Sequence, residues 1–145
     1  KENFTYDQNG LGMWLSESQA FKGKAVPFNN KSTPSDTRMW NNLKSECAER
    51  FVKAVKSGEY SISEEVLNRK FTDRKKHTYT VKERLLEERR ALKRKDSATS
   101  RFEIIEKTQM KLEVGHSPDF IEGLLMIEYL FKKKTGCIRH GFKNW

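Results

Sequence analysis

Two carboxylates near the C-terminal end of the chain lie at the start of a predicted helix. Within residues 117–123, Ser117 is a favourable N-cap and Pro118 suits the first helical position. Asp119 and Glu122 are three residues apart, so both side chains project from one face of that helix. Carboxylates held this way on a basic protein could hold a metal ion near a phosphate group. On these residues alone, a simpler interpretation is stronger: acidic side chains are common in first turns because they complement the helix dipole.

A third carboxylate, Asp7, follows a β-prone run near the N-terminus. The run covers residues 4–6, and a turn that contains glycines, residues 7–12, comes directly after it. A helix over 12–21 and a second strand over 24–29 would follow, and so short a strand–helix–strand unit predicts a parallel pair. Ligands bind at the carboxyl ends of such strands, where Asp7 lies. The alternative is that Asp7 only supports the turn, as aspartate often does.

The strand-end carboxylate and the helix-borne carboxylates can converge on a single site. Carboxylate oxygens are ligands that Mg²⁺ and Mn²⁺ prefer. Two such ions about 4 Å apart can activate water and stabilise the leaving oxygen in phosphodiester cleavage. Asp7, Asp119 and Glu122 are therefore candidate ligands of one metal site.

The other predicted elements would hold these residues in place. The clearest helix begins at Ser35 or Asp36 and ends at Gly58, because apolar residues recur in it about every fourth position. Further predicted elements are a helix over 61–71, a highly charged helix over 82–95, a strand over 102–105 and a helix from Ser117 to Lys134. The sequence thus predicts one α/β domain over 1–145, with a short, mainly parallel sheet and flanking helices.

The composition favours a polyanionic partner. Charged residues make up 34% of the 145 residues, and the formal net charge is +9. Nucleic acid is the first candidate for a chain of this charge. Membrane is a weaker alternative, because no apolar run is long enough to cross a bilayer. Cys47 and Cys137 lack the paired spacing of zinc ligands, which indicates two reduced thiols in a cytosolic setting.

Two basic segments are candidates for contact with DNA phosphates. The first consists of Arg69, Lys70, Arg74, Lys75 and Lys76. Little acid is present to balance this segment, so phosphate contact is its favoured interpretation, with binding that weakens steeply with salt. The second is the helix over 82–95, where glutamates can pair with lysine and arginine on the same helix. For that helix a solvated face is the favoured interpretation.

The two acidic motifs, in this order, resemble the nuclease part of phage large terminase subunits. The resemblance lies in residues 6–12, YDQNGLG, and residues 115–124, GHSPDFIEGL. It implies an RNase H-like nuclease domain, C-terminal to an ATPase motor, that cuts concatemeric DNA during head packaging with Mg²⁺ or Mn²⁺. Asp7 would match the second catalytic carboxylate and Asp119 the third. Glu122 falls where many members have another aspartate, so its match is imperfect.

The sequence also departs from the family pattern. The family's first catalytic aspartate lies on a strand earlier than Lys1, and the phosphate loop of the ATPase motor, where ATP binds, is absent. The expectation is therefore a partial RNase H-like fold, inactive alone, from a phage or prophage protein in the bacterial cytoplasm. Double-stranded DNA, the small terminase subunit and the portal are the implied partners. Two other classes stay open: a non-catalytic basic nucleic-acid-binding module, and a scaffold segment that docks a partner through residues 82–95.

Overall fold

A short parallel sheet forms the N-terminal part of the fold. The computed structural model describes residues 4–8, 15, 18–21, 24–73 and 75–133. Strand β1 (Phe4–Asp7) pairs in parallel with β2 (Ala25–Phe28), which confirms the predicted strand pair. A short 3-10 turn, η1 (Gln19–Phe21), precedes β2. Most of the predicted helix over 12–21 lies outside the described residues.

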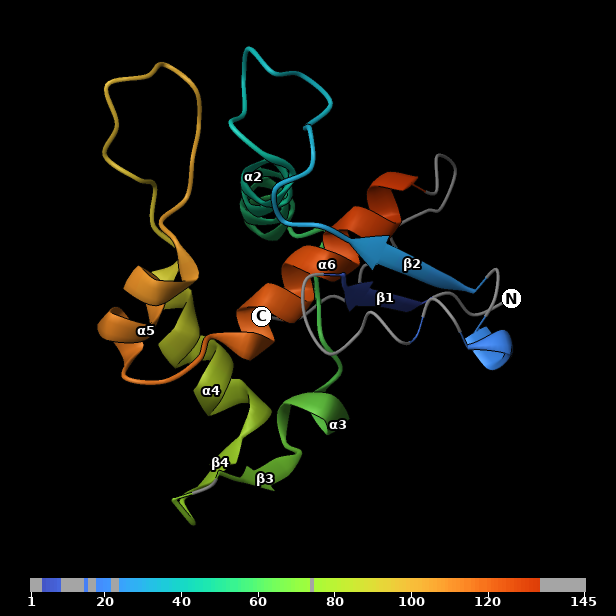
Figure 1. Ribbon diagram of the computed structural model, residues 1–145. Helices are drawn as coiled ribbons and strands as arrows, with labels where there is room; N and C mark the ends of the chain where they lie inside the picture. Colours follow the sequence, from blue (N-terminus) through green and yellow to red (C-terminus); the bar gives the residue numbers. More distant parts are fainter. Residues whose placement is uncertain (1–3, 9–14, 16–17, 22–23, 74, 134–145) are drawn as a thin grey trace.

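Two long helices occupy the centre of the molecule. These are α2 (Leu43–Lys56) and α6 (Asp119–Lys133), and they pack against each other. Helix α6 also contacts both strands on one side and α4 (Val81–Glu88) near its own start. Figure 1 shows α2 end-on beside α6, so the two axes cross steeply. Helix α6 is therefore the element that connects the sheet with the rest of the chain.

The start of α2 differs from the prediction. The helix begins at Leu43, and the side chain of Asn42 caps it by accepting a hydrogen bond of 2.9 Å from the Ser45 amide. Ser35, one of the two predicted caps, instead donates from its amide and its hydroxyl to the carboxylate of Glu46. The predicted end is confirmed, because Gly58 follows the helix with a φ of +72°.

The basic segment forms a β-hairpin that the sequence did not indicate. The predicted helix over 61–71 is only one turn, α3 (Glu64–Leu67), with Ser63 as its N-cap. Strand β3 (Lys70–Thr72) then pairs antiparallel with β4 (Thr78–Thr80). Lys76 takes the left-handed conformation in the connecting turn, with a φ of 64°. A non-glycine residue at that position gave no turn signal in the sequence.

The charged helix over 82–95 is shorter than predicted and is not simply a solvated face. Helix α4 begins after Thr80, which forms a capping box with Glu83, and passes into the 3-10 turn η2 (Arg89–Ala91). One side of α4 is buried, including the charged side chain of Glu88. In place of the predicted strand over 102–105, Phe102 and Ile104 each form an isolated β-bridge. Helix α5 (Lys107–Val114) follows and ends at Gly115, whose φ is +76°.

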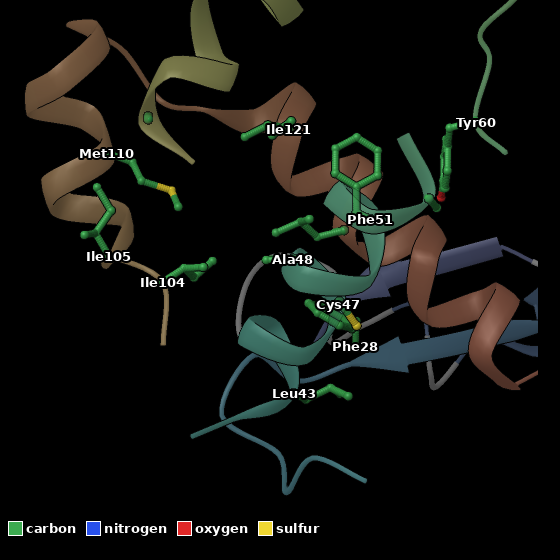
Figure 2. Close-up of a cluster of buried hydrophobic side chains, with 13 residues drawn as sticks. Phe28, Leu43, Cys47, Ala48, Phe51, Tyr60, Ile104, Ile105, Met110 and Ile121 are labelled. Atoms are coloured by element: carbon green, nitrogen blue, oxygen red, sulfur yellow. The ribbon is translucent and has the colours of Figure 1, made fainter. Parts of the chain in front are cut away.

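The hydrophobic core lies where α2 and α6 meet the neighbouring segments. Helix α2 places Leu43, Cys47, Ala48 and Phe51 on one face toward this core, and Figure 2 shows Phe28 of β2 beside Cys47. The remaining core members are Ala54, Tyr60, Ala91, Ile104, Ile105, Met110, Ile121 and Leu125. Because Ile121 and Leu125 belong to α6, burial of this face fixes the helix that carries Asp119. No helix within the described ranges has the length and apolar character needed to cross a membrane.

Candidate functional site

Asp119 is the first residue of α6 and keeps most of its carboxylate open to solvent. Its side chain is 67% exposed. The Oδ1 atom accepts hydrogen bonds of 2.6 Å from the Ser117 hydroxyl and 2.9 Å from Nζ of Lys107. Burial acts to raise the pKa of Asp119, but these two hydrogen bonds outweigh it and hold the pKa below its usual value. Asp119 is therefore an accessible carboxylate that stays ionised at neutral pH.

Glu122 lies one turn further along α6 and is much less accessible. Its side chain is 14% exposed, and each of its carboxylate oxygens accepts a hydrogen bond from a lysine. Lys44, which is on α2, binds Oε1, and Lys107, at the start of α5, binds Oε2. Glu122 thus connects three helices in this structure. A metal ion at Glu122 would have to displace at least one of these ammonium groups.

Lys107 bridges the two carboxylates of α6. Its Nζ lies 2.9 Å from Asp119 Oδ1 and 2.5 Å from Glu122 Oε2. Burial acts to lower the pKa of Lys107, but its hydrogen bonds with Glu122 and Asp119 raise that pKa above the usual value. Sequence reasoning missed both Lys107 and Lys44, because nothing in the spacing of the chain brings them to residues 119–122. The two lysines place positive charges beside the carboxylates of Asp119 and Glu122.

Asp7 lies at the position that the sequence predicted, at the carboxyl end of β1. It pairs with Phe28 at the end of β2, and the backbone continues the ladder with a 2.9 Å bond from the Gln8 amide to the Phe28 carbonyl. Strand β1 packs against α6. In Figure 1 the arrowheads of β1 and β2 both point toward the side of the molecule where α6 begins. The predicted turn after Asp7 lies outside the described residues.

The described residues offer the type of donor atom that a metal ion prefers, but too few such side chains lie together to hold one. Carboxylate oxygens suit Mg²⁺ and Mn²⁺. However, across the part of the chain that the structure describes, no three His, Cys, Asp or Glu side chains form a group able to hold a metal. Asp7, Asp119 and Glu122 therefore do not form a complete site by themselves. Further ligands are needed before these carboxylates can bind an ion tightly.

The basic hairpin and the start of α6 border one cavity. This cavity measures about 680 Å³, and its lining includes Lys75 and His77 of the hairpin together with Ser117 and Asp119. The other predicted DNA-binding residues are Arg69, Lys70 and Lys76, which are exposed, and Arg74, which lies outside the described residues. Arg69 also forms a salt bridge with Glu65. Of the predicted basic residues, Lys75 thus lines the same cavity as the Asp119 carboxylate. Arg84 and the acidic side chains of Asp73, Glu87 and Glu88 also line it.

Comparisons with known proteins identify the fold. No family model matches the chain, and no curated protein matches it. The nuclease domain of the large terminase subunit gp2 of bacterial virus Sf6 is similar, with 22% identity and a TM-score of 0.60, over 88% of this chain and 64% of that one. Mutant forms of that domain with manganese and with calcium match at the same identity and TM-score. The chain spans 65% of the manganese-containing domain, just under two thirds of its length. The chain therefore has the RNase H-like fold of the nuclease domain of a phage large terminase subunit.

Proposed function

We propose that this chain is part of a metal-dependent DNA endonuclease, the nuclease domain of a phage or prophage large terminase subunit. One observation carries the proposal: in a fold shared with a terminase nuclease domain, Asp119 and the basic hairpin border the same 680 Å³ cavity. A carboxylate beside cationic side chains suits a site that holds a metal ion against a DNA phosphate. The cut would fall in concatemeric viral DNA during genome packaging.

Asp7 and Asp119 are the proposed metal ligands and catalytic residues. The bound ion, Mg²⁺ or Mn²⁺, would supply an activated water and stabilise the leaving oxygen. Asp119 would contribute an ionised, accessible oxygen, and Asp7 would contribute a second carboxylate from the edge of the sheet. Glu122 would act as a further ligand, or would hold Lys107 in place. Since the described residues supply an incomplete ligand set, we expect this chain alone to cleave DNA poorly or not at all.

The hairpin is the proposed DNA-binding surface. Its candidate residues are Arg69, Lys70, Arg74, Lys75 and Lys76. Cations there would neutralise phosphates on either side of the cleavage point and position the duplex, without reading its sequence. The longer protein would act in the cytoplasm of a bacterial host together with a small terminase subunit and a portal. In this proposal residues 1–145 form one domain, the C-terminal part of the nuclease.

Nicking of supercoiled plasmid tests the proposal. A longer polypeptide that completes the nuclease domain would be assayed with Mn²⁺, alongside its Asp119→Asn and Asp7→Asn variants. Asp96→Asn, at an exposed carboxylate that does not line the cavity, is the matched control. We expect both site variants to lose at least about a hundredfold in rate, since one lost electrostatic contact at a reacting centre costs on that order. Undiminished nicking by Asp119→Asn would overturn the assignment.

One observation favours a second candidate, a non-catalytic DNA-binding module. Lys44 and Lys107 already neutralise Glu122, and Lys107 also binds Asp119, as in a structural salt-bridge network. This candidate requires salt-sensitive DNA binding with no change on adding Mn²⁺. Metal-dependent nicking that needs Asp119 would exclude it.

A further inference from the structure

Glu88 is a buried carboxylate that the sequence did not identify as part of the site. It is the last residue of α4, and its relative exposure is 1%. An ionised carboxylate buried in this way costs several kcal/mol by typical values unless specific contacts offset the cost. Burial raises the pKa of Glu88 to about 7, against the opposing effect of a hydrogen bond from the Ile121 backbone. Specific contacts of Glu88 must therefore offset the cost of burying its carboxylate.

One of these contacts is with the first turn of α6. Oε2 of Glu88 accepts a hydrogen bond of 2.8 Å from the backbone amide of Ile121. Ile121 is the third residue of α6, so its amide is one of the four that have no partner within the helix. Glu88 therefore caps α6 from a neighbouring helix, and the dipole of α6 favours its negative charge there. The predicted cap, Ser117, donates its hydroxyl to Asp119 instead.

The second oxygen of Glu88 faces the loop that leads into α6. Oε1 has no hydrogen-bond partner among the described residues, and it lies 3.8 Å from Nδ1 of His116. The same Nδ1 atom is 2.9 Å from the Ser117 carbonyl, and Nε2 of His116 is 3.1 Å from Glu87. Glu88 thus contacts the chain on both sides of Asp119. Asp119 itself is two residues before the bonded amide, in the same helical turn.

We propose that Glu88 is a positioning residue that sets the place of the Asp119 carboxylate by binding the first turn of α6. The inference rests on the proposed function only in taking Asp119 as the metal ligand. Metal ligands must be held to within about 0.5 Å of their productive positions, and groups behind them commonly do this. Glu88 does so here through the backbone of α6.

Two substitutions separate positioning from packing. Glu88→Ala removes the bond to Ile121, whereas Glu88→Gln keeps the size of the side chain and an oxygen that can accept from the same amide. Glu49→Ala is the matched control, because Glu49 is also a paired glutamate on a helix, but it contacts Trp40 and Lys53 rather than α6 or the loop before it. Thermal unfolding first identifies a temperature at which all variants of the 145-residue chain are folded.

Amide hydrogen exchange is the first measurement, and it needs no metal. Glu88→Ala should speed exchange at Ile121 about tenfold or more, since a capping bond of this kind contributes roughly 1–2 kcal/mol. Exchange in the middle of α2 should stay unchanged, and Glu88→Gln should restore most of the protection at Ile121. Unchanged exchange at Ile121 in the folded Glu88→Ala variant would overturn the proposal.

Mn²⁺ binding is the second measurement. It uses the longer polypeptide that completes the nuclease domain, and it is followed by paramagnetic broadening of amides around Asp119. Glu88→Ala should weaken the Mn²⁺ affinity about tenfold, Glu88→Gln should restore it, and Glu49→Ala should stay within about twofold of wild type. Equal Mn²⁺ affinity in Glu88→Ala and wild type would overturn the positioning role. If the wild type shows no broadening, or if its broadening persists in Asp119→Asn, the proposed function fails. The exchange measurement alone then decides whether Glu88 fixes the start of α6.

Discussion

Removing the charge of Lys107 should strengthen metal binding at Asp119. In the free protein the ammonium group of Lys107 lies 2.9 Å from Oδ1 of Asp119, where an incoming cation would compete with it. Lys107→Met keeps a side chain of similar length and removes the charge. The variant therefore leaves Asp119 with its Ser117 hydrogen bond and without the Lys107 ammonium group.

The expected gain follows from the geometry of the pair. Two unit charges 2.9 Å apart attract by about 1.4 kcal/mol in a medium like bulk water. Because Asp119 is 67% exposed, solvent screening and side-chain freedom reduce this to about 1 kcal/mol or less. A gain of about 1 kcal/mol corresponds to Mn²⁺ binding that is about fivefold tighter. The pKa of Asp119 should rise in the variant, since Lys107 is one of the groups that lower it.

The assay is a Mn²⁺ titration followed by broadening of amide signals over residues 117–123, at low and at high ionic strength. The gain should shrink at high salt, because the interaction that it removes is screened. Lys107→Arg, which keeps the charge, should bind Mn²⁺ no more tightly than wild type. Equal or weaker Mn²⁺ binding by Lys107→Met would show that Lys107 does not compete with the ion.

Three further predictions concern other parts of the chain. Lys132→Met leaves the buried Glu46 carboxylate without its cation and should destabilise the protein by roughly 3 kcal/mol in urea unfolding. Burial acts to raise the pKa of Glu46, but hydrogen bonds from Lys132 and from the amide and hydroxyl of Ser35 outweigh it and hold that pKa below its usual value of 4.5. The stability that this carboxylate contributes should therefore be present above pH 4.5 and be lost as the pH falls further. Replacing Lys75 and Lys76 with alanine should weaken DNA binding and reduce the slope of its salt dependence by about two, in a fluorescence titration at several salt concentrations. Burial raises the pKa of Cys47 to about 12, so mass mapping should find its thiol alkylated only after unfolding.

The sequence was most informative where a local signal determines the structure. The pattern Ser-Pro-Asp before an apolar face predicted the start of α6, and the short strand–helix–strand unit predicted the parallel pair that ends at Asp7. The hairpin over 70–80 was missed because its turn depends on Lys76 in a left-handed conformation rather than on glycine. The predicted start of α2 was wrong because Asn42, and not Ser35, provides the cap.

The surroundings of Asp119 depend on tertiary contacts that no spacing rule contains. Lys44, Glu88 and Lys107 come from three different helices, and each is charged at a position where periodicity indicates either a solvated face or no preference. Which of these charges becomes buried depends on how α2, α4 and α5 pack around α6. Sequence reasoning could therefore name the carboxylates but not the groups that hold them.

A single Mn²⁺ titration tests most directly whether Asp7 and Asp119 share one metal site. The signals to follow are the amides of residues 6–8 and of residues 117–121, in the longer polypeptide that completes the nuclease domain. If Asp7 and Asp119 bind one ion, both groups broaden at the same Mn²⁺ concentration, and Asp119→Asn abolishes the broadening in both. Broadening of one group without the other, or broadening that survives Asp119→Asn, would contradict it.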